Sequence, residues 1–144
     1  MPDPAPSPRS ADFPHHVVER LRFGDTDQQG HINNAVFATL FESGRVAFLY
    51  DVDKGLPPAG TQFVIAQLTI RFLGEMRFPG EVIVASGVSR IGNSSVTLSQ
   101  ALFVGDACTA TADSVIVLTD LESRRSTSLT ASVRAHFEAL AIEA

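Results

Sequence analysis

The sequence predicts an α+β domain in which an antiparallel β-sheet wraps around one long central α-helix. Residues 33–50 contain no proline and are apolar around most of the circumference at helical spacing, as expected of a helix that is buried on several sides. Four later segments alternate apolar and polar residues with the period of a β-strand. The elements therefore follow the order β-α-β-β-β-β-α, and only this helix is large enough to cover the sheet.

One predicted strand precedes this helix, and a loop follows it. Residues 15–24, HHVVERLRFG, place Val17, Leu21 and Phe23 on one side, which favours a strand. The main stripe of the helix consists of Phe37, Leu40, Phe41, Gly44, Ala47 and Phe48. The helix ends before DKGLPPAG, because glycines and paired prolines are typical of a loop.

Four strands are predicted after that loop. In FVIAQLTIRFL, one face carries Val64, Ala66, Leu68, Ile70 and Phe72, and the other carries Gln67, Thr69 and Arg71. The segments EVIVASGVSRI, SVTLSQALFV and CTATADSVIVLT alternate likewise, with the hairpin signals Gly92-Asn93 and Gly105-Asp106 between them. We therefore expect a four-strand antiparallel meander. A short amphipathic helix closes the chain, with apolar positions at Leu129, Val133, Phe137 and Leu140.

The composition indicates one globular domain. The chain has 144 residues, of which 44% are hydrophobic and 19% charged. The net charge of −5 argues against a nucleic-acid partner, and no apolar run is long enough to cross a membrane. The lone Cys108 excludes an internal disulfide and favours the cytoplasm. Residues 1–12 are proline-rich and lack the apolar core of a signal peptide. We expect them to form a disordered tail before a single domain over residues 13–144.

Polar groups are concentrated where the central helix begins. The stretch FGDTDQQGHINN contains two aspartates, a glycine, a histidine and an Asn-Asn pair: Asp25, Asp27, Gly30, His31, Asn33 and Asn34. A carboxylate can act as a general base or a nucleophile. Amides at a helix N-terminus are unpaired and lie at the positive end of the dipole, so they polarise a carbonyl oxygen placed there. Asp27 and a helix start near Asn33 or Asn34 supply both groups, and Gly30 permits a tight turn between them.

The longer stretch RFGDTDQQGHINNAVFATLFESGR resembles the 4-hydroxybenzoyl-CoA thioesterase-like branch of the hotdog acyl-CoA thioesterases. Its members read aromatic-x-Asp-x-Asp-x-x-Gly-(His)-x-x-Asn, in which the histidine is optional, followed by a helix with Glu and Arg. The matching residues are Asp25, Asp27, Gly30, Asn34, Glu42 and Arg45. Glu81 stands where this family usually has Asp. The resemblance implies a hotdog fold that hydrolyses an acyl-CoA thioester to the free acid and CoA. It also implies that Asp27 is catalytic and that the amide of Asn34 or its neighbour polarises the thioester carbonyl. No cofactor is expected, since coenzyme A is part of the substrate.

Each of these residues also has a structural interpretation. Asp27 alone is compatible with a turn or a cap, and Asp25 is expected to hold the loop through backbone donors. His31 is either a base or a hydrogen-bonding support for the loop. Asn33 and Asn34 suit helix caps first and ligand contacts second. Glu42 and Arg45 are expected to pair with each other or with a dimer partner. Some other hotdog thioesterases carry their carboxylate on this helix, which makes Glu42 the reserve candidate.

Two rival functions share this fold. Hotdog dehydratases and hydratases pair a catalytic histidine with a carboxylate, but the run Asp-x-Asn-Pro-x-His is missing here. A non-catalytic acyl-binding domain is the other rival, although such a domain would not require Asp27. Acyl-carrier-protein thioesters remain possible substrates, because the catalytic acid does not sense what lies behind the sulfur. The Gly-x-Ser-x-Gly elbow of other thioesterases is absent.

The remaining expectations concern ligands and partners. Arg71 and Arg90 are candidates for the CoA phosphates, with solvated surface as the alternative for each. Phe37, Phe41, Phe63 and Phe72 either line an aryl pocket or fill the core, and the core is preferred. No metal site is expected, because adjacent His15 and His16 point to opposite sides of a strand and no Cys or His pair has ligand spacing. We expect Cys108 to be a small buried residue and not a nucleophile. A homodimer or homotetramer is expected, since a small sheet of this kind has an edge and a face that a second copy can cover.

Overall fold

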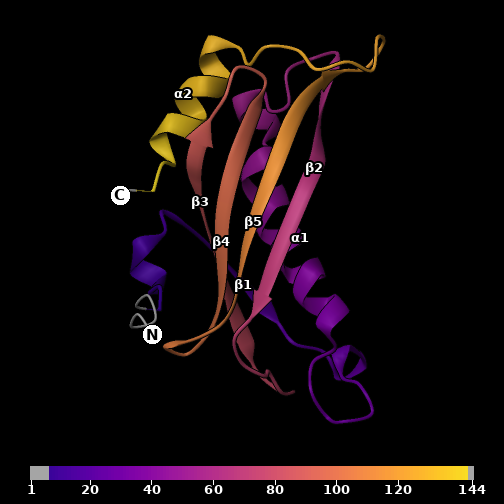
Figure 1. The fold of residues 1–144 in the computed structure, drawn as a ribbon, viewed down its shortest axis with the longest axis vertical. Coiled ribbons are helices and arrows are strands. Elements are labelled where there is room, and N and C mark those ends of the chain that lie inside the picture. Colours follow the sequence, from indigo (N-terminus) through magenta and orange to yellow (C-terminus); the bar gives the residue numbers. More distant parts are fainter. Residues whose placement is uncertain (1–6, 143–144) are drawn as a thin grey trace, which may run out of the picture.

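The computed structural model describes residues 7–142 and has the expected α+β architecture, a five-stranded antiparallel sheet curved around one long helix (Figure 1). The elements are β1 His15–Arg20, α1 Asn34–Leu49, β2 Thr61–Phe72, β3 Glu81–Ile91, β4 Ser95–Val104, β5 Ala107–Asp120 and α2 Ala131–Ala139. Their order confirms the hotdog arrangement. The predicted boundaries of α1 differ by one residue at each end, whereas β1 is four residues shorter than the predicted 15–24. No helix within residues 7–142 is long and apolar enough to span a bilayer.

The predicted four-strand meander is wrong for β2, which does not pair with the next strand along the chain, β3. The sheet order is β1-β3-β4-β5-β2, so only β3, β4 and β5 are joined as a meander. Strand β2 pairs antiparallel with β5, from Thr61 opposite Asp120 to Phe72 opposite Ala110. The two tight turns at Gly92-Asn93 and Gly105-Asp106 do join neighbouring strands. The connection at residues 73–80 is too long for a tight hairpin, and it carries the chain from one edge of the sheet to β3 near the other.

A β-bulge in β2 changes which residues face the helix. Ile65 pairs with Ile116, and Gln67 pairs with the preceding residue of β5, Val115, so Ala66 has no partner in the ladder. One extra residue reverses the alternation of side chains along the strand. The predicted face is therefore correct for Leu68, Ile70 and Phe72 but wrong for the residues before the bulge. Phe63 and Ile65 share the inner face, and Val64 lies on the outer one.

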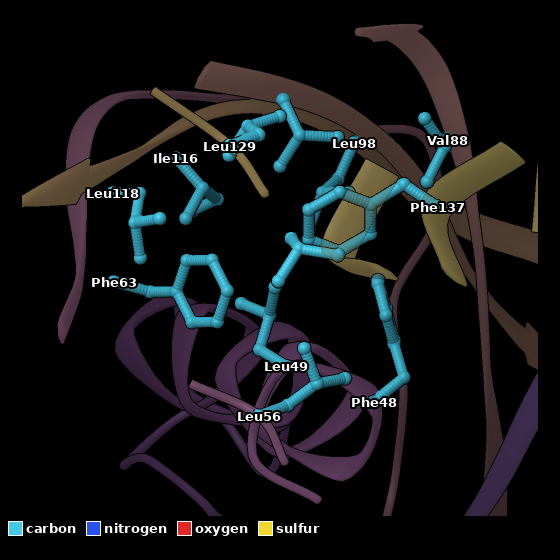
Figure 2. Close-up of a cluster of buried hydrophobic side chains, with 12 residues drawn as sticks. Phe48, Leu49, Leu56, Phe63, Val88, Leu98, Ile116, Leu118, Leu129 and Phe137 are labelled. Atoms are coloured by element: carbon cyan, nitrogen blue, oxygen red, sulfur yellow. The ribbon is translucent and has the colours of Figure 1, made fainter. Parts of the chain in front are cut away.

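The helix packs across the half of the sheet formed by β1, β3 and β4. Its first half buries Phe37, Leu40 and Phe41 against the strands, and its second half buries Phe48 and Leu49. Figure 2 shows this second cluster, in which Phe137 of α2 meets side chains from α1 and the strands. Gly44 marks the closest approach, because an added Cβ would overlap Val84 Cγ1.

One charged residue of α1 is buried. Arg45 is 7% exposed, and its Nη1 donates to Gln100 Oε1 at 3.5 Å. Gln100 Nε2 in turn donates to the Phe41 carbonyl at 3.0 Å and to Ser86 Oγ at 2.9 Å. The expected ion pair with Glu42 is not among the salt bridges of residues 7–142, and Glu42 is exposed. Burial lowers the pKa of Arg45.

The outer face of β3 and β4 is covered by both ends of the described chain. Phe13 packs edge-on against Phe103, with ring centroids 6.3 Å apart. An added Cβ at Gly87 would overlap Ile142, so the C-terminal segment lies close against β3. The predicted tail at residues 1–12 includes Ser10–Asp12, which form a short 3-10 helix, whereas residues 1–6 lie outside the described part.

Candidate active site

The polar loop before α1 is anchored by Asp25. Asp25 is 4% exposed, and its carboxylate accepts hydrogen bonds from Arg22 at the backbone N (2.8 Å), Nη2 (2.8 Å) and Nε (3.2 Å). The bond from the Arg22 side chain holds the pKa of Asp25 below its ordinary value. The Asp25 carbonyl also accepts from the Asn33 amide at 2.9 Å, which ties the start of the loop to the start of the helix. Asp25 is therefore placed to support the loop.

One carboxylate oxygen of Asp27 accepts hydrogen bonds from the loop, and the other accepts none from residues 7–142. Oδ1 accepts from the amides of Gln29 (2.9 Å) and His31 (3.2 Å), and the Asp27 amide donates to the His31 carbonyl at 2.8 Å. Gly30 closes this turn with φ = +80°, a left-handed conformation that glycine adopts without strain. Oδ2 has no hydrogen-bond donor in residues 7–142.

The first turn of α1 leaves one amide unpaired. Asn33 is the N-cap, and its Oδ1 accepts from the Ala35 amide at 2.9 Å. The Asn33 carbonyl accepts from the Val36 amide at 2.9 Å. The Asn34 amide has no acceptor within the described chain. It lies at the positive end of the helix dipole, where a negative oxygen is stabilised.

Asp27 and Asn34 line the same cavity of about 330 Å³. In Figure 1 the loop leading into α1 lies at the lower end of the molecule, toward which the arrowhead of β2 points. Residues from the end of β2 and the segment after it complete the wall. The full lining is Asp27, Gln29, His31, Ile32, Asn34, Phe37, Phe72, Leu73, Gly74 and Glu75. The rings of Phe37 and Phe72 meet with centroids 5.1 Å apart, so one part of the cavity is apolar.

A larger hollow of about 980 Å³ lies on the outer face of the sheet. It is lined by Pro8, Ala11, Asp12, Phe13, Pro14, Ser89, Ser99, Ala139, Ala141 and Ile142. This lining contains one carboxylate, that of Asp12, but no histidine and no N-terminus of an α-helix. The residues that line the smaller cavity include an aspartate, a histidine and Asn34, whose backbone amide is unpaired, so we take this cavity as the candidate active site despite its size.

Glu75 is a cavity residue that the sequence did not reveal. Its Oε2 lies 3.1 Å from His31 Nε2 and 3.6 Å from Arg77 Nη2. The segment after β2 reaches the loop because the Ile32 amide donates to the Met76 carbonyl at 2.8 Å. This contact joins two segments that are distant in sequence, so only the three-dimensional structure could identify Glu75 as a neighbour of His31.

Several predicted site residues lie away from the cavity. Glu42 is exposed two turns further along α1. Arg71 pairs with Thr111 on the outer face of β2, opposite to the face of Phe72. Arg90 lies next to the β3–β4 turn, at the far end of the sheet from the cavity. Of the four phenylalanines considered for a pocket, Phe37 and Phe72 line it, whereas Phe41 and Phe63 are buried in the core.

The other ionisable side chains considered from the sequence do not form a second site. Within residues 7–142 no group of three His, Cys, Asp or Glu side chains is arranged to hold a metal ion. His15 packs against Phe48 with ring centroids 5.2 Å apart, and burial lowers the pKa of His15. His16 Nε2 lies 2.7 Å from the Ser10 carbonyl oxygen. Cys108 is half-buried, and its burial raises the pKa of the thiol.

Known proteins resemble the chain in sequence. One relative is an acyl-acyl carrier protein thioesterase, ATL2, of Arabidopsis thaliana chloroplasts, which is 28% identical over 92 residues. The match covers 62% of this chain and 49% of that protein, so the chain spans about half the length of the curated relatives it matches.

Solved structures resemble the chain more completely. A predicted thioesterase from Bacillus stearothermophilus is 27% identical with a TM-score of 0.80, and the match covers 88% of this chain and 96% of that one. A thioesterase from Thermus thermophilus, solved in complex with coenzyme A and Zn, is 28% identical with a TM-score of 0.77. That match covers 90% of this chain and 95% of the other. The family model described as the thioesterase-like superfamily matches residues 21–137. The chain therefore belongs to the thioesterase-like superfamily, with the hotdog fold, and this membership supports thioester hydrolysis as its chemistry.

Proposed function

We propose that the protein hydrolyses an acyl-CoA thioester to the free acid and coenzyme A. The observation that carries this proposal is the juxtaposition at one cavity of the Asp27 carboxylate, with Oδ2 uncommitted, and the unpaired Asn34 amide. The two groups match the two needs of thioester hydrolysis. One group activates the attacking oxygen, and the other stabilises the carbonyl oxygen as it becomes negative.

In the general-base form of this mechanism, Asp27 accepts a proton from water while the water oxygen bonds to the thioester carbonyl carbon. The carbonyl oxygen takes the displaced electron pair and is held by the Asn34 amide. When the carbonyl re-forms, the carbon–sulfur bond breaks, and Asp27 gives the proton to the leaving thiolate. In the nucleophilic form, Asp27 itself bonds to the carbonyl carbon, the carbon–sulfur bond breaks, and CoA leaves as the thiolate. Water then hydrolyses the resulting anhydride, which restores the Asp27 carboxylate, releases the acid and supplies the proton that the thiolate takes up. A positioned base contributes roughly 100- to 10,000-fold in rate, and one oxyanion donor roughly 100- to 1,000-fold.

The preference for coenzyme A rests on the Thermus thermophilus relative, which was solved with coenzyme A bound. The Arabidopsis relatives are acyl-carrier-protein thioesterases, which makes an acyl-acyl carrier protein the second candidate substrate. A non-catalytic acyl-thioester-binding domain is the third possibility. Phe37 and Phe72 at the apolar part of the cavity are placed to contact the acyl group, and Arg71 and Arg90 remain candidates for CoA contacts from elsewhere in an assembly.

We also propose that the protein acts in the cytoplasm, where a lone cysteine such as Cys108 remains reduced. Its active form is proposed to be a homodimer or a dimer of dimers. The support for an oligomer is that β2 is an edge strand. It pairs with β5 on one side, and no strand of the described residues pairs with its other side.

The experiment is hydrolysis of a panel of acyl-CoA and acyl-carrier-protein thioesters of varied acyl length, with released thiol as the signal. We expect turnover of at least one acyl-CoA, lost in Asp27→Asn and retained in Asp53→Asn. Asp53 is a matched control because it is an exposed aspartate beyond the opposite end of α1. If only carrier-protein thioesters were hydrolysed, the substrate would be an acyl-acyl carrier protein and not an acyl-CoA. Binding of acyl-CoA without turnover would identify a non-catalytic domain.

A further inference from the structure

Glu75 and His31 contact each other in the wall of the candidate active site. Their side chains come from different segments, and the contact from His31 Nε2 to Glu75 Oε2 is 3.1 Å. The His31 side chain is 24% exposed and that of Glu75 is 62% exposed, so the pair lies where the cavity opens to solvent. Both residues line the cavity together with Asp27 and Asn34.

The backbone of His31 is fixed relative to Asp27. The His31 amide donates to Asp27 Oδ1 at 3.2 Å, and the His31 carbonyl accepts from the Asp27 amide at 2.8 Å. These bonds place the Cα of His31 but leave its ring free to rotate. The polar contact of the ring among residues 7–142 is with Glu75 Oε2. The backbone bonds thus fix the position of His31, and the contact with Glu75 is available to orient its ring.

The contact with Glu75 also selects a tautomer. An ionised carboxylate only accepts hydrogen bonds, so the Nε2 atom that meets it must carry the proton. In the neutral ring, Nδ1 is then an acceptor. No hydrogen bond from the described residues occupies Nδ1. That atom therefore has no partner among residues 7–142 that would compete with a water molecule.

We propose that Glu75 is a positioning residue for the proposed hydrolysis. It keeps the proton of His31 on Nε2, so that Nδ1 accepts a hydrogen bond from the attacking water while Asp27 removes the other proton of that water. Glu75 acts only through His31 and does not touch the substrate. The inference rests on the proposed function, but it assigns a role to a residue that neither the motif nor the helix start includes.

The alternative partner of Glu75 provides a matched control. Arg77 Nη2 lies 3.6 Å from Glu75 Oε2, and both side chains are more than half exposed. Exposed ion pairs of this kind contribute little to stability. If Glu75 merely braced its loop through Arg77, then Arg77→Met would reproduce the effect of Glu75→Met. The proposal requires that Arg77→Met keeps wild-type kinetics.

The kinetic test is a double-mutant cycle with one good acyl-thioester substrate. We expect Glu75→Met to lower kcat about 10-fold, as for the loss of one positioning hydrogen bond, with little change in KM. Glu75→Gln, which keeps an acceptor oxygen at this position, should recover most of that loss. In a His31→Ala background, Glu75→Met should have no further effect, because the group through which it acts is gone. Additive losses in the double variant would overturn the proposal.

A spectroscopic test does not depend on turnover. Long-range proton–nitrogen NMR distinguishes the two neutral tautomers of each of the four histidines, and His31→Ala assigns the signals of His31. At a pH where imidazoles are neutral, we expect the Nε2–H tautomer in the wild type and a mixture in Glu75→Met. An Nδ1–H tautomer in the wild type would overturn the proposal. An enzyme that releases no thiol from any substrate would instead overturn the proposed function, whatever the tautomer.

Discussion

The two aspartates of the motif differ in what surrounds them, and this difference assigns their roles at the scale of single residues. Asp25 is almost fully buried and its carboxylate is occupied by Arg22. Asp27 is partly exposed, lines the cavity and keeps one oxygen free. A carboxylate already saturated by donors is a poor base, because those bonds stabilise its charged form. Asp27 is consequently the better candidate for chemistry.

The role of Asp25 predicts a pH-dependent effect on stability. Asp25→Asn should lower the free energy of unfolding at pH 7 by about 1 kcal/mol, a usual value for lost hydrogen bonds of a buried group. The folded-state pKa of Asp25 is lowered from 3.8. Its contribution is therefore complete above about pH 4 and disappears as the pH falls through the depressed folded pKa.

Urea unfolding of the wild type and Asp25→Asn between about pH 2 and pH 7 measures this effect. The two stability curves should converge in acid. A difference that stays constant across this range would mean that the ionised form of Asp25 contributes nothing.

The motif at residues 23–34 allowed the supporting position of Asp25, the tight turn at Gly30 and the helix cap to be predicted, because their contacts are local in sequence, whereas the catalytic role of Asp27 stays a prediction. Asn33 and Asn34 were both plausible caps, and the structure shows that Asn33 is the cap and Asn34 the first helical residue. Glu75 could not be predicted, since its contact with His31 depends on how the segment after β2 folds over the loop. The buried position of Arg45 was missed for the same reason, because its neighbour Gln100 lies on β4.

At the scale of elements, the fit of α1 on the sheet depends on Gly44. Glycine inside a helix normally costs about 0.5–1 kcal/mol relative to alanine. At this position an added Cβ would overlap Val84 Cγ1 and approach Gln100 Nε2 to 3.0 Å. The close packing of helix on strand β3 therefore outweighs the helical propensity of alanine.

We predict that Gly44→Ala lowers the free energy of unfolding by about 1–3 kcal/mol, the usual cost of overpacking a core. Glu42→Ala on the exposed side of α1 is the control and should change it by less than about 0.5 kcal/mol. Chemical denaturation of both variants provides the comparison. A stabilised Gly44→Ala protein would show that the helix can move away from β3 without cost.

Element types followed from periodicity, whereas the pairing of β2 did not. The period-two pattern marks a strand but carries no information on its neighbour, and β2 is joined to β5 by contacts distant in sequence. The bulge at Ala66 has no clear signature in FVIAQLTIRFL, because the residues at 63–66 are all apolar and are compatible with either face. Register and bulges are set by the partner strand and by the packing of the inner face.

At the scale of the whole molecule, part of the inner sheet face remains uncovered. The helix packs on β1, β3 and β4, and the inner residues of β2 stay exposed: 44% for Ile65, 38% for Leu68 and 49% for Phe72. Val46 on α1 is also 46% exposed. An apolar surface beside an unpaired strand edge is suited to a second copy of the chain.

We therefore predict a homodimer or a dimer of dimers, measured by sedimentation at micromolar concentration. Leu68→Lys should shift the population toward monomer, because it places a charge on the proposed contact surface. The control Thr69→Lys introduces the same charge on the opposite face of β2. A wild-type protein that sediments as a stable monomer would contradict this prediction.

The central claim is that Asp27 and the start of α1 form a thioester-hydrolysing site. Its most direct test is the kcat of Asp27→Asn on the best acyl-CoA substrate, with His31→Ala and Asn34→Ala measured beside it. Asp27→Asn should lose at least about 100-fold with the fold intact. Asn34→Ala should lose least, because the backbone amide remains, and His31→Ala should fall between them. A folded Asp27→Asn protein with the kcat of the wild type would contradict the claim and transfer the chemistry to Glu42 or exclude catalysis altogether.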